Sequence, residues 1–113
     1  MNNLKKNKKI NVAILIFNQV EAMDLNGPLD VLIKANYFDN KYNVYTVSEK
    51  KEKLFLEGES LKMIAKYSFK NSPKSDILII PGASPEELKK NTLKEKNILD
   101  WIKKEHLQNT MTI

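Results

Sequence analysis

Two short stretches of the chain are apolar almost without interruption. Residues 10–17 read INVAILIF and residues 76–80 read DILII, so branched aliphatic side chains dominate both. Short apolar runs of this composition are typical of strands that are buried on both faces. Because helices cover both faces of a parallel sheet, the two runs predict central strands of such a sheet.

A helix is expected between these two strands. Asn26 can cap a helix, Pro28 suits a first turn, and the apolar positions that follow recur at helical spacing. The pattern therefore predicts a first helix over about residues 26–38.

The rest of the chain continues to alternate strands with helices. The further expected elements are a strand at 42–47, a hairpin joining 54–56 to 61–65, a turn at 68–72, a short helix at 85–90, a capping box at 92–95 that opens a second long helix, and a strand that begins within 110–113. This order favours one α/β domain over residues 10–113, with an open, mostly parallel sheet and helices on both faces. Residues 1–9 are expected to form a flexible, basic N-terminus.

Charge and cysteine content narrow the range of functions. The 113 residues carry a formal net charge of +5, and four of the lysines lie within residues 5–9. No stripe of basic and aromatic residues follows them, so nucleic-acid binding is not expected. The chain has no cysteine, which excludes a disulfide, a thiolate metal site and a thiol nucleophile within these residues. No stretch has the length of a membrane span or the pattern of a secretory signal, so a cytoplasmic protein without membrane contact is expected.

Candidate chemistry lies in two loops that follow the apolar strands. Ligands of open parallel sheets bind beyond the carboxyl ends of the strands. The loop at residues 18–26 brings Glu21 and Asp24 to that edge, and the loop at residues 81–86 brings Gly82 and Ala83, whose small side chains let a ligand approach backbone N–H groups. The sequence therefore predicts that a carboxylate loop and a glycine turn meet over the same end of the sheet.

Two motifs, one after each apolar strand, resemble those of a known family, and several shorter segments continue the match. The matching segments are residues 12–17, 20–28, 31–32, 45–47, 67–69 and 76–82. Together they resemble the opening of the ThiJ/PfpI superfamily, which has a class I glutamine amidotransferase-like, flavodoxin-like fold. The branch that contains isonitrile hydratases and the sensor domains of AraC-type regulators is the most similar. The resemblance covers about residues 10–113.

The resemblance implies a cysteine site of which this chain holds one part. Asp24 falls on the family's carboxylate that contacts the cysteine, while Glu21, Gly82 and Ala83 fall where substrate would bind, with Pro-Gly-Ala here in place of Pro-Gly-Gly. The cysteine follows a strand that would begin at residues 111–113, so the domain is truncated before the nucleophile turn. The implied function is the N-terminal portion of an isonitrile hydratase-like protein, inactive alone, with no cofactor and no metal.

The same residues can also be explained by purely structural roles. Asp24 can cap the first helix, Glu21 can be a solvated loop carboxylate, and His106 suits the C-terminal end of its helix. The alternative function is a non-catalytic, ligand-sensing domain of an AraC-type regulator. A receiver or dinucleotide-binding domain is disfavoured, because Pro81 stands where a receiver has its phosphoacceptor and no G-x-G-x-x-G follows the first strand.

The expected partners follow from the same pattern. A small-molecule ligand fits either function. The apolar strand at residues 76–80 would have an open edge if its neighbour were incomplete, and such an edge pairs readily with another chain. A homo-oligomer, or association through this open edge, is therefore predicted.

Overall fold

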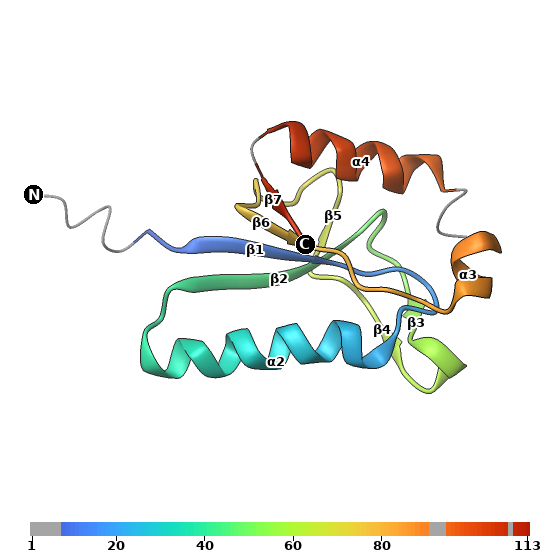
Figure 1. Ribbon diagram of the computed structural model, residues 1–113, viewed down its shortest axis with the longest axis horizontal. Helices are drawn as coiled ribbons and strands as arrows, with labels where there is room; N and C mark the ends of the chain where they lie inside the picture. Colours follow the sequence, from blue (N-terminus) through green and yellow to red (C-terminus); the bar gives the residue numbers. More distant parts are fainter. Residues whose placement is uncertain (1–7, 91–94, 109) are drawn as a thin grey trace, which may run out of the picture.

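The computed structural model describes residues 8–90, 95–108 and 110–113, and it contains a five-stranded sheet whose strands are all parallel (Figure 1). The strand order is β5-β2-β1-β6-β7. The strands are β1 (Ile10–Leu15), β2 (Tyr42–Ser48), β5 (Tyr67–Ser68), β6 (Ile77–Ile79) and β7 (Met111–Thr112). The other elements are α2 (Ala22–Phe38), the hairpin of β3 (Leu54–Phe55) and β4 (Lys62–Met63) with the 3₁₀ turn η1 (Glu57–Glu59), α3 (Pro85–Lys90) and α4 (Lys96–Leu107). The predicted α/β class with an open, mostly parallel sheet is confirmed.

The two long helices lie on opposite sides of the sheet (Figure 1). The connection from β1 to β2 runs one way along the sheet, and the connection from β6 to β7 runs the other way. Since strand–helix–strand crossovers are right-handed, this reversal places α2 on one face and α4 on the other. The reversal lies between β1 and β6, where open α/β sheets bind ligands.

The core is built around β1 and its neighbours. Ile14, Leu15, Val47 and Leu78 have no exposed surface, as the apolar runs at residues 10–17 and 76–80 predict. On the α4 side, Trp101 stacks flat on Phe69, with ring centroids 4.4 Å apart. This contact joins α4 to the turn that follows β5.

The first helix begins four residues earlier than the sequence predicts. Its N-cap is Glu21, and Asn26 and Pro28 lie inside the helix. The early start is stabilised by distant segments: the backbone N–H of Glu21 donates to the carbonyl of Gly82 and that of Ala22 to the carboxylate of Glu57. These bonds satisfy N–H groups that have no partner within a helix. Local sequence cannot show such partners, so the prediction of residue 26 was wrong.

Most other predicted elements are confirmed, within one to three residues at their ends. The helix over residues 85–90, the hairpin and the strand within residues 110–113 are all present. The parallel strand β5 was not predicted, because it is two residues long and overlaps the turn predicted at residues 68–72. The predicted capping box falls mainly in residues 91–94 and the basic N-terminus mainly in residues 1–7, which lie outside the described residues.

Buried polar groups tie α4 and β7 to the start of β6. The Ser75 hydroxyl donates to the Glu105 carboxylate at 2.9 Å, and the Thr110 hydroxyl donates to the Ser75 carbonyl at 2.8 Å. Nearby, burial raises the pKa of Tyr45 to about 12, and the Glu105 carboxylate adds to the shift. These groups hold the end of the sheet opposite the candidate site.

No helix among the described residues is long and apolar enough to cross a membrane.

Candidate functional site

The loops after β1 and β6 meet at the carboxyl end of the sheet. Ile14 of β1 pairs with Ile79 of β6, so the chain segments that leave the two strands are neighbours. The backbone N–H of Gly82 donates to Asp24 Oδ2 at 3.0 Å, and the backbone N–H of Glu21 donates to the Gly82 carbonyl at 3.0 Å. The structure thus brings Glu21, Asp24 and Gly82 together.

The carboxyl groups of Glu21 and Asp24 interact electrostatically. The pKa of Glu21 is raised, first by the negative charge of Asp24, then by desolvation, by the Glu57 carboxylate and by a side-chain hydrogen bond with Asp24. Because two neighbouring carboxylates disfavour each other's ionised form, the pair can hold a proton at a pH where an isolated glutamate would lose it. A group that keeps its proton in this way is suited to proton transfer.

Gly82 is required at its position by close contact. A Cβ atom there would lie 2.9 Å from Asp24 Oδ2 and 4.0 Å from Glu21 Oε2, so a side chain would push the aspartate away from the backbone N–H. Neither Gly82 nor Ala83 has a positive φ. The alanine is therefore compatible with this turn, and its half-buried side chain packs against the core.

The β3–β4 hairpin fixes the carboxylate loop. Gln19 has a left-handed backbone with φ of 67°, which is uncommon for a residue other than glycine. Its side-chain Oε1 accepts the backbone N–H of Gly58 at 3.2 Å, and Asn18 Oδ1 accepts that of Phe55 at 2.9 Å. Sequence reasoning missed these two residues. Their only local signal is the polar pair that follows the apolar run of β1.

Two other polar residues, Ser84 and His106, lie outside this cluster. The Ser84 hydroxyl accepts the backbone N–H of Glu87 at 3.1 Å, so Ser84 caps α3. His106 lies in the last turn of α4, where Nδ1 is 3.3 Å from the Thr112 hydroxyl. The end of α4 lies away from α3 and from the loop that follows β6 (Figure 1).

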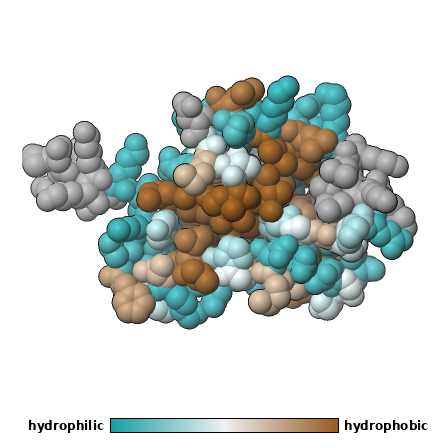
Figure 2. Space-filling model, viewed as in Figure 1, coloured by the Kyte–Doolittle hydropathy of each residue, from teal (hydrophilic) through white to brown (hydrophobic). Residues whose placement is uncertain are grey.

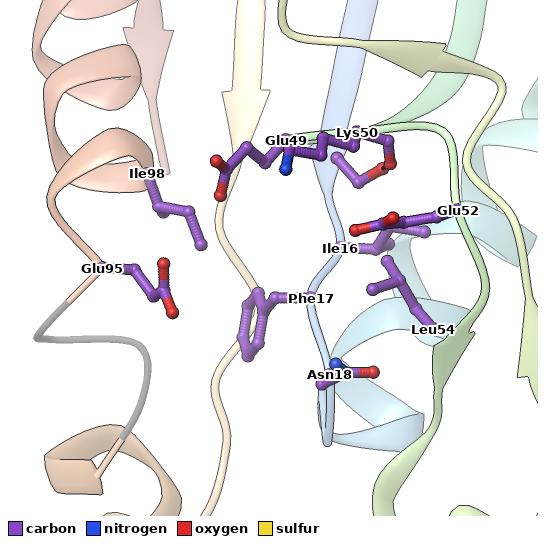
Figure 3. A pocket seen from close by; sticks show the side chains of 10 residues that line it. Ile16, Phe17, Asn18, Glu49, Lys50, Glu52, Leu54, Glu95 and Ile98 are labelled. Atoms are coloured by element: carbon purple, nitrogen blue, oxygen red, sulfur yellow. Dashed lines mark hydrogen bonds between the residues drawn. The ribbon is translucent and has the colours of Figure 1, made fainter.

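A separate cavity of about 300 Å³ opens on the α4 side of the same sheet edge (Figure 3). Phe17 and Ile98 form apolar walls, and the carboxylates of Glu49, Glu52 and Glu95 lie around them. Neither Asp24 nor Gly82 lines this cavity. Among the described residues, no group of three or more His, Cys, Asp or Glu side chains is arranged to hold a metal ion.

Replacing Glu21 by Gln is expected to raise the melting temperature at neutral pH. The folded state raises the pKa of Glu21, so folding favours the protonated form. The resulting stabilisation is complete below the unfolded pKa and is lost as pH rises through the higher folded value. The neutral amide removes that loss, so the difference between variant and wild type should shrink towards zero near pH 4. Thermal melts from pH 4 to pH 8 measure this, with Glu59→Gln as the control. An equal shift at every pH would contradict the assignment.

Comparisons with known proteins agree with this geometry. The model of the DJ-1/PfpI family matches residues 10–113. No curated protein matches the chain.

Solved structures share the fold. A two-domain protein from Anabaena variabilis with DJ-1/ThiJ/PfpI-like and ferritin-like domains has 22% identity and a TM-score of 0.69, over 92% of this chain and 28% of its own. A putative transcriptional regulator from Vibrio parahaemolyticus has 20% identity and a TM-score of 0.74, over 93% and 55%. An AraC family regulator from Pseudomonas putida has 15% identity and a TM-score of 0.68, over 91% and 62%. The chain thus spans about a quarter to three fifths of these proteins.

Proposed function

Because the chain belongs to the DJ-1/PfpI family, and has no cysteine, we propose that it supplies the carboxylate and glycine-turn part of a thiol site and is catalytically silent alone. The nucleophile would come from polypeptide outside these 113 residues. The activity of the complete site would be addition to a small electrophile of the isonitrile or carbonyl type.

The contact between Asp24 and Gly82 carries the proposal. It lies at the carboxyl ends of β1 and β6, and β7 ends beside them, because the backbone N–H of Ile80 donates to the Ile113 carbonyl at 2.9 Å. A thiol placed just after Ile113 would therefore enter the space next to Asp24. Glu21, Gly82 and Ala83 are the substrate-binding residues of the proposal.

The chemistry needs both a nucleophile and a proton carrier. A thiolate would bond to the terminal carbon of an isonitrile, and that carbon would take up one proton from a neighbouring acid. Glu21, whose pKa is raised first by the charge of Asp24, would hold and return that proton. Without sulfur the first bond cannot form, and Ser84 cannot replace it because its hydroxyl caps α3.

A thiol added at the end of the chain tests the proposal. With Gly-Gly-Cys appended after Ile113, an ionised Asp24 should raise the thiol pKa, because like charges disfavour each other. The Asp24→Asn variant of the extended chain should then be alkylated by iodoacetamide about three- to tenfold faster at neutral pH. The measurement is the alkylation rate as a function of pH.

Asp30→Asn in the same extended chain is the matched control, since Asp30 is a carboxylate of α2 paired with Lys34. Equal thiol reactivity in the Asp24 and Asp30 variants would count against a shared site. Turnover of an isonitrile by the unextended chain that disappears on Asp24→Ala would contradict its silence.

A second candidate is a ligand-sensing domain of an AraC-type regulator. It is supported by the regulators among the structural neighbours and needs no nucleophile. Reading the gene beyond the codon for Ile113 separates the two: a cysteine turn favours the thiol site, and a helix-turn-helix favours the regulator.

A further inference from the structure

The β3–β4 hairpin is joined to the carboxylate loop by main-chain hydrogen bonds. The backbone N–H of Gln19 donates to the Phe55 carbonyl at 2.7 Å, and the backbone N–H of Glu57 donates to the Val20 carbonyl at 3.1 Å. Val20 also pairs with Leu56 in a parallel β-bridge. These bonds fix the hairpin beside the start of α2, so the residues of its turn have a defined place relative to the candidate site.

The hairpin brings a third carboxylate to this site. Glu57 Oε1 accepts the backbone N–H of Ala22, the first residue of α2, at 3.1 Å. Glu21 and Asp24, on either side of Ala22, carry the other two carboxylates. The pKa of Glu21 is raised first by the charge of Asp24, then by desolvation and then by the charge of Glu57. The three side chains therefore form one electrostatic group, here called the carboxylate cluster.

Positive side chains do not pair with the cluster in the part of the chain that the structure describes. The ion pairs found there lie within α2, just after it and within α4, and none includes Glu21, Asp24 or Glu57. The N-terminus of α2 supplies the equivalent of about half a positive charge, which attracts carboxylates but does not balance three of them. We therefore expect a negative potential in the space next to Gly82.

The cluster lies where an incoming molecule can meet it. Glu57 and Asp24 are exposed, and Glu21 is half-buried. Figure 2 shows an apolar band between α2 and α4, whereas the surface around the β3–β4 hairpin is mainly polar. Charges at such an entrance change the rate at which charged molecules reach a site more than the rate for neutral ones.

We propose that Glu57 is a positioning and selectivity residue, which holds the first turn of α2 and makes the site favour uncharged electrophiles over anionic ones. The inference rests on the proposed function for the kind of reaction, and it adds the substrate class: isonitriles, aldehydes or ketones without a carboxylate or phosphate group. A 2-oxo acid would be repelled, because its charge has the same sign as the cluster.

Two substitutions separate holding the helix from carrying charge. Glu57→Gln keeps an oxygen that can accept the Ala22 N–H, whereas Glu57→Ala removes both the acceptor and the charge. Amide hydrogen exchange at Ala22 should therefore stay unchanged in Glu57→Gln and become about three- to tenfold faster in Glu57→Ala. Glu57→Gln should nevertheless lower the pKa of Glu21, measured by carbon-13 NMR, because a neighbouring negative charge is lost. Glu59→Gln, in the same turn, is the matched control and should change neither quantity.

Nitroxide probes of opposite charge measure the potential in the chain itself. At low ionic strength a cationic PROXYL derivative should relax the Gly82 amide proton at least about threefold faster than an anionic one, and Glu57→Gln should reduce this ratio about twofold. Asp39→Asn removes an exposed carboxylate at the other end of α2 and should leave the ratio unchanged. Equal relaxation by the two probes would mean that the net positive charge of the chain dominates, and would overturn the proposal. An unchanged ratio in Glu57→Gln would also overturn it.

Alkylation of the chain extended by Gly-Gly-Cys measures selectivity at the thiol. Relative to the free Gly-Gly-Cys peptide, the rate with iodoacetamide divided by that with the anionic iodoacetate should be at least about threefold higher, and Glu57→Gln should lower it about twofold. A ratio equal to that of the free peptide, with thiol reactivity that still depends on Asp24, would overturn the selectivity and leave the thiol site intact. Thiol reactivity independent of Asp24, with the nitroxide result as expected, would overturn the thiol site and support the place of Glu57 in the cluster.

Discussion

Replacing Leu78 by Ala is expected to lower the free energy of unfolding by about 3–4 kcal/mol, because it removes buried methyl groups and leaves a cavity. Leu78 has no exposed surface, and in the sheet it lies between Ala13 of β1 and Thr112 of β7. Neither neighbour is large enough to fill the space. The loss is a large part of the stability of a small domain. Urea unfolding followed by circular dichroism at one fixed protein concentration measures it.

Leu61→Ala makes the same chemical change at an exposed position of the hairpin, and should cost well under about 1 kcal/mol. The comparison isolates the effect of burial. A similar small cost for Leu78→Ala would mean that α4 does not cover this face of the sheet.

The sequence was sufficient for the framework of this fold. Residues 10–17 and 76–80 predicted two central parallel strands, because apolar side chains on both faces of a strand require cover on both sides. The strands β1 and β6 are indeed adjacent. Their adjacency then placed the two loops together, so the meeting of Asp24 with Gly82 could be anticipated before any coordinates.

What the sequence did not show depends on contacts between distant segments. The start of α2 is set by the Gly82 carbonyl and the Glu57 carboxylate, and Glu57 lies 35 residues from Ala22. A local pattern favoured Asn26 as the cap because asparagine is a good cap in isolation. The two-residue strand β5 has no periodicity to detect.

The fine structure of the site was also beyond the sequence. Gln19 has a left-handed backbone although it is not a glycine, so the sequence does not indicate this conformation. A hydrogen bond from the backbone N–H of Gly58 to the Gln19 side chain stabilises it. Similarly, the coupling of Glu21 to Asp24 depends on the first turn of α2, which the predicted start at residue 26 had left in a loop.

Replacing Trp101 by Ala is expected to have an effect of similar size, about 3–5 kcal/mol. Trp101 is 7% exposed, and its ring lies flat on that of Phe69 with an interplanar angle of 3°. Trp101 is the largest side chain that α4 buries. Its loss should weaken the packing of α4, including that of Ile98, which lines the cavity. The change in the free energy of unfolding is again measured with urea.

Leu99→Ala, on the exposed side of the same helix, should cost only a few tenths of a kcal/mol, because little buried surface is lost. The contribution of the stacked pair is separable with Phe69→Leu in a double-mutant cycle, where an aromatic pair contributes about 0.5–1.5 kcal/mol beyond burial. A coupling energy near zero would mean that α4 is held by burial of Trp101 and Ile98 alone. A coupling energy in that range would make the Phe69–Trp101 pair the specific contact that aligns α4 with the turn after β5.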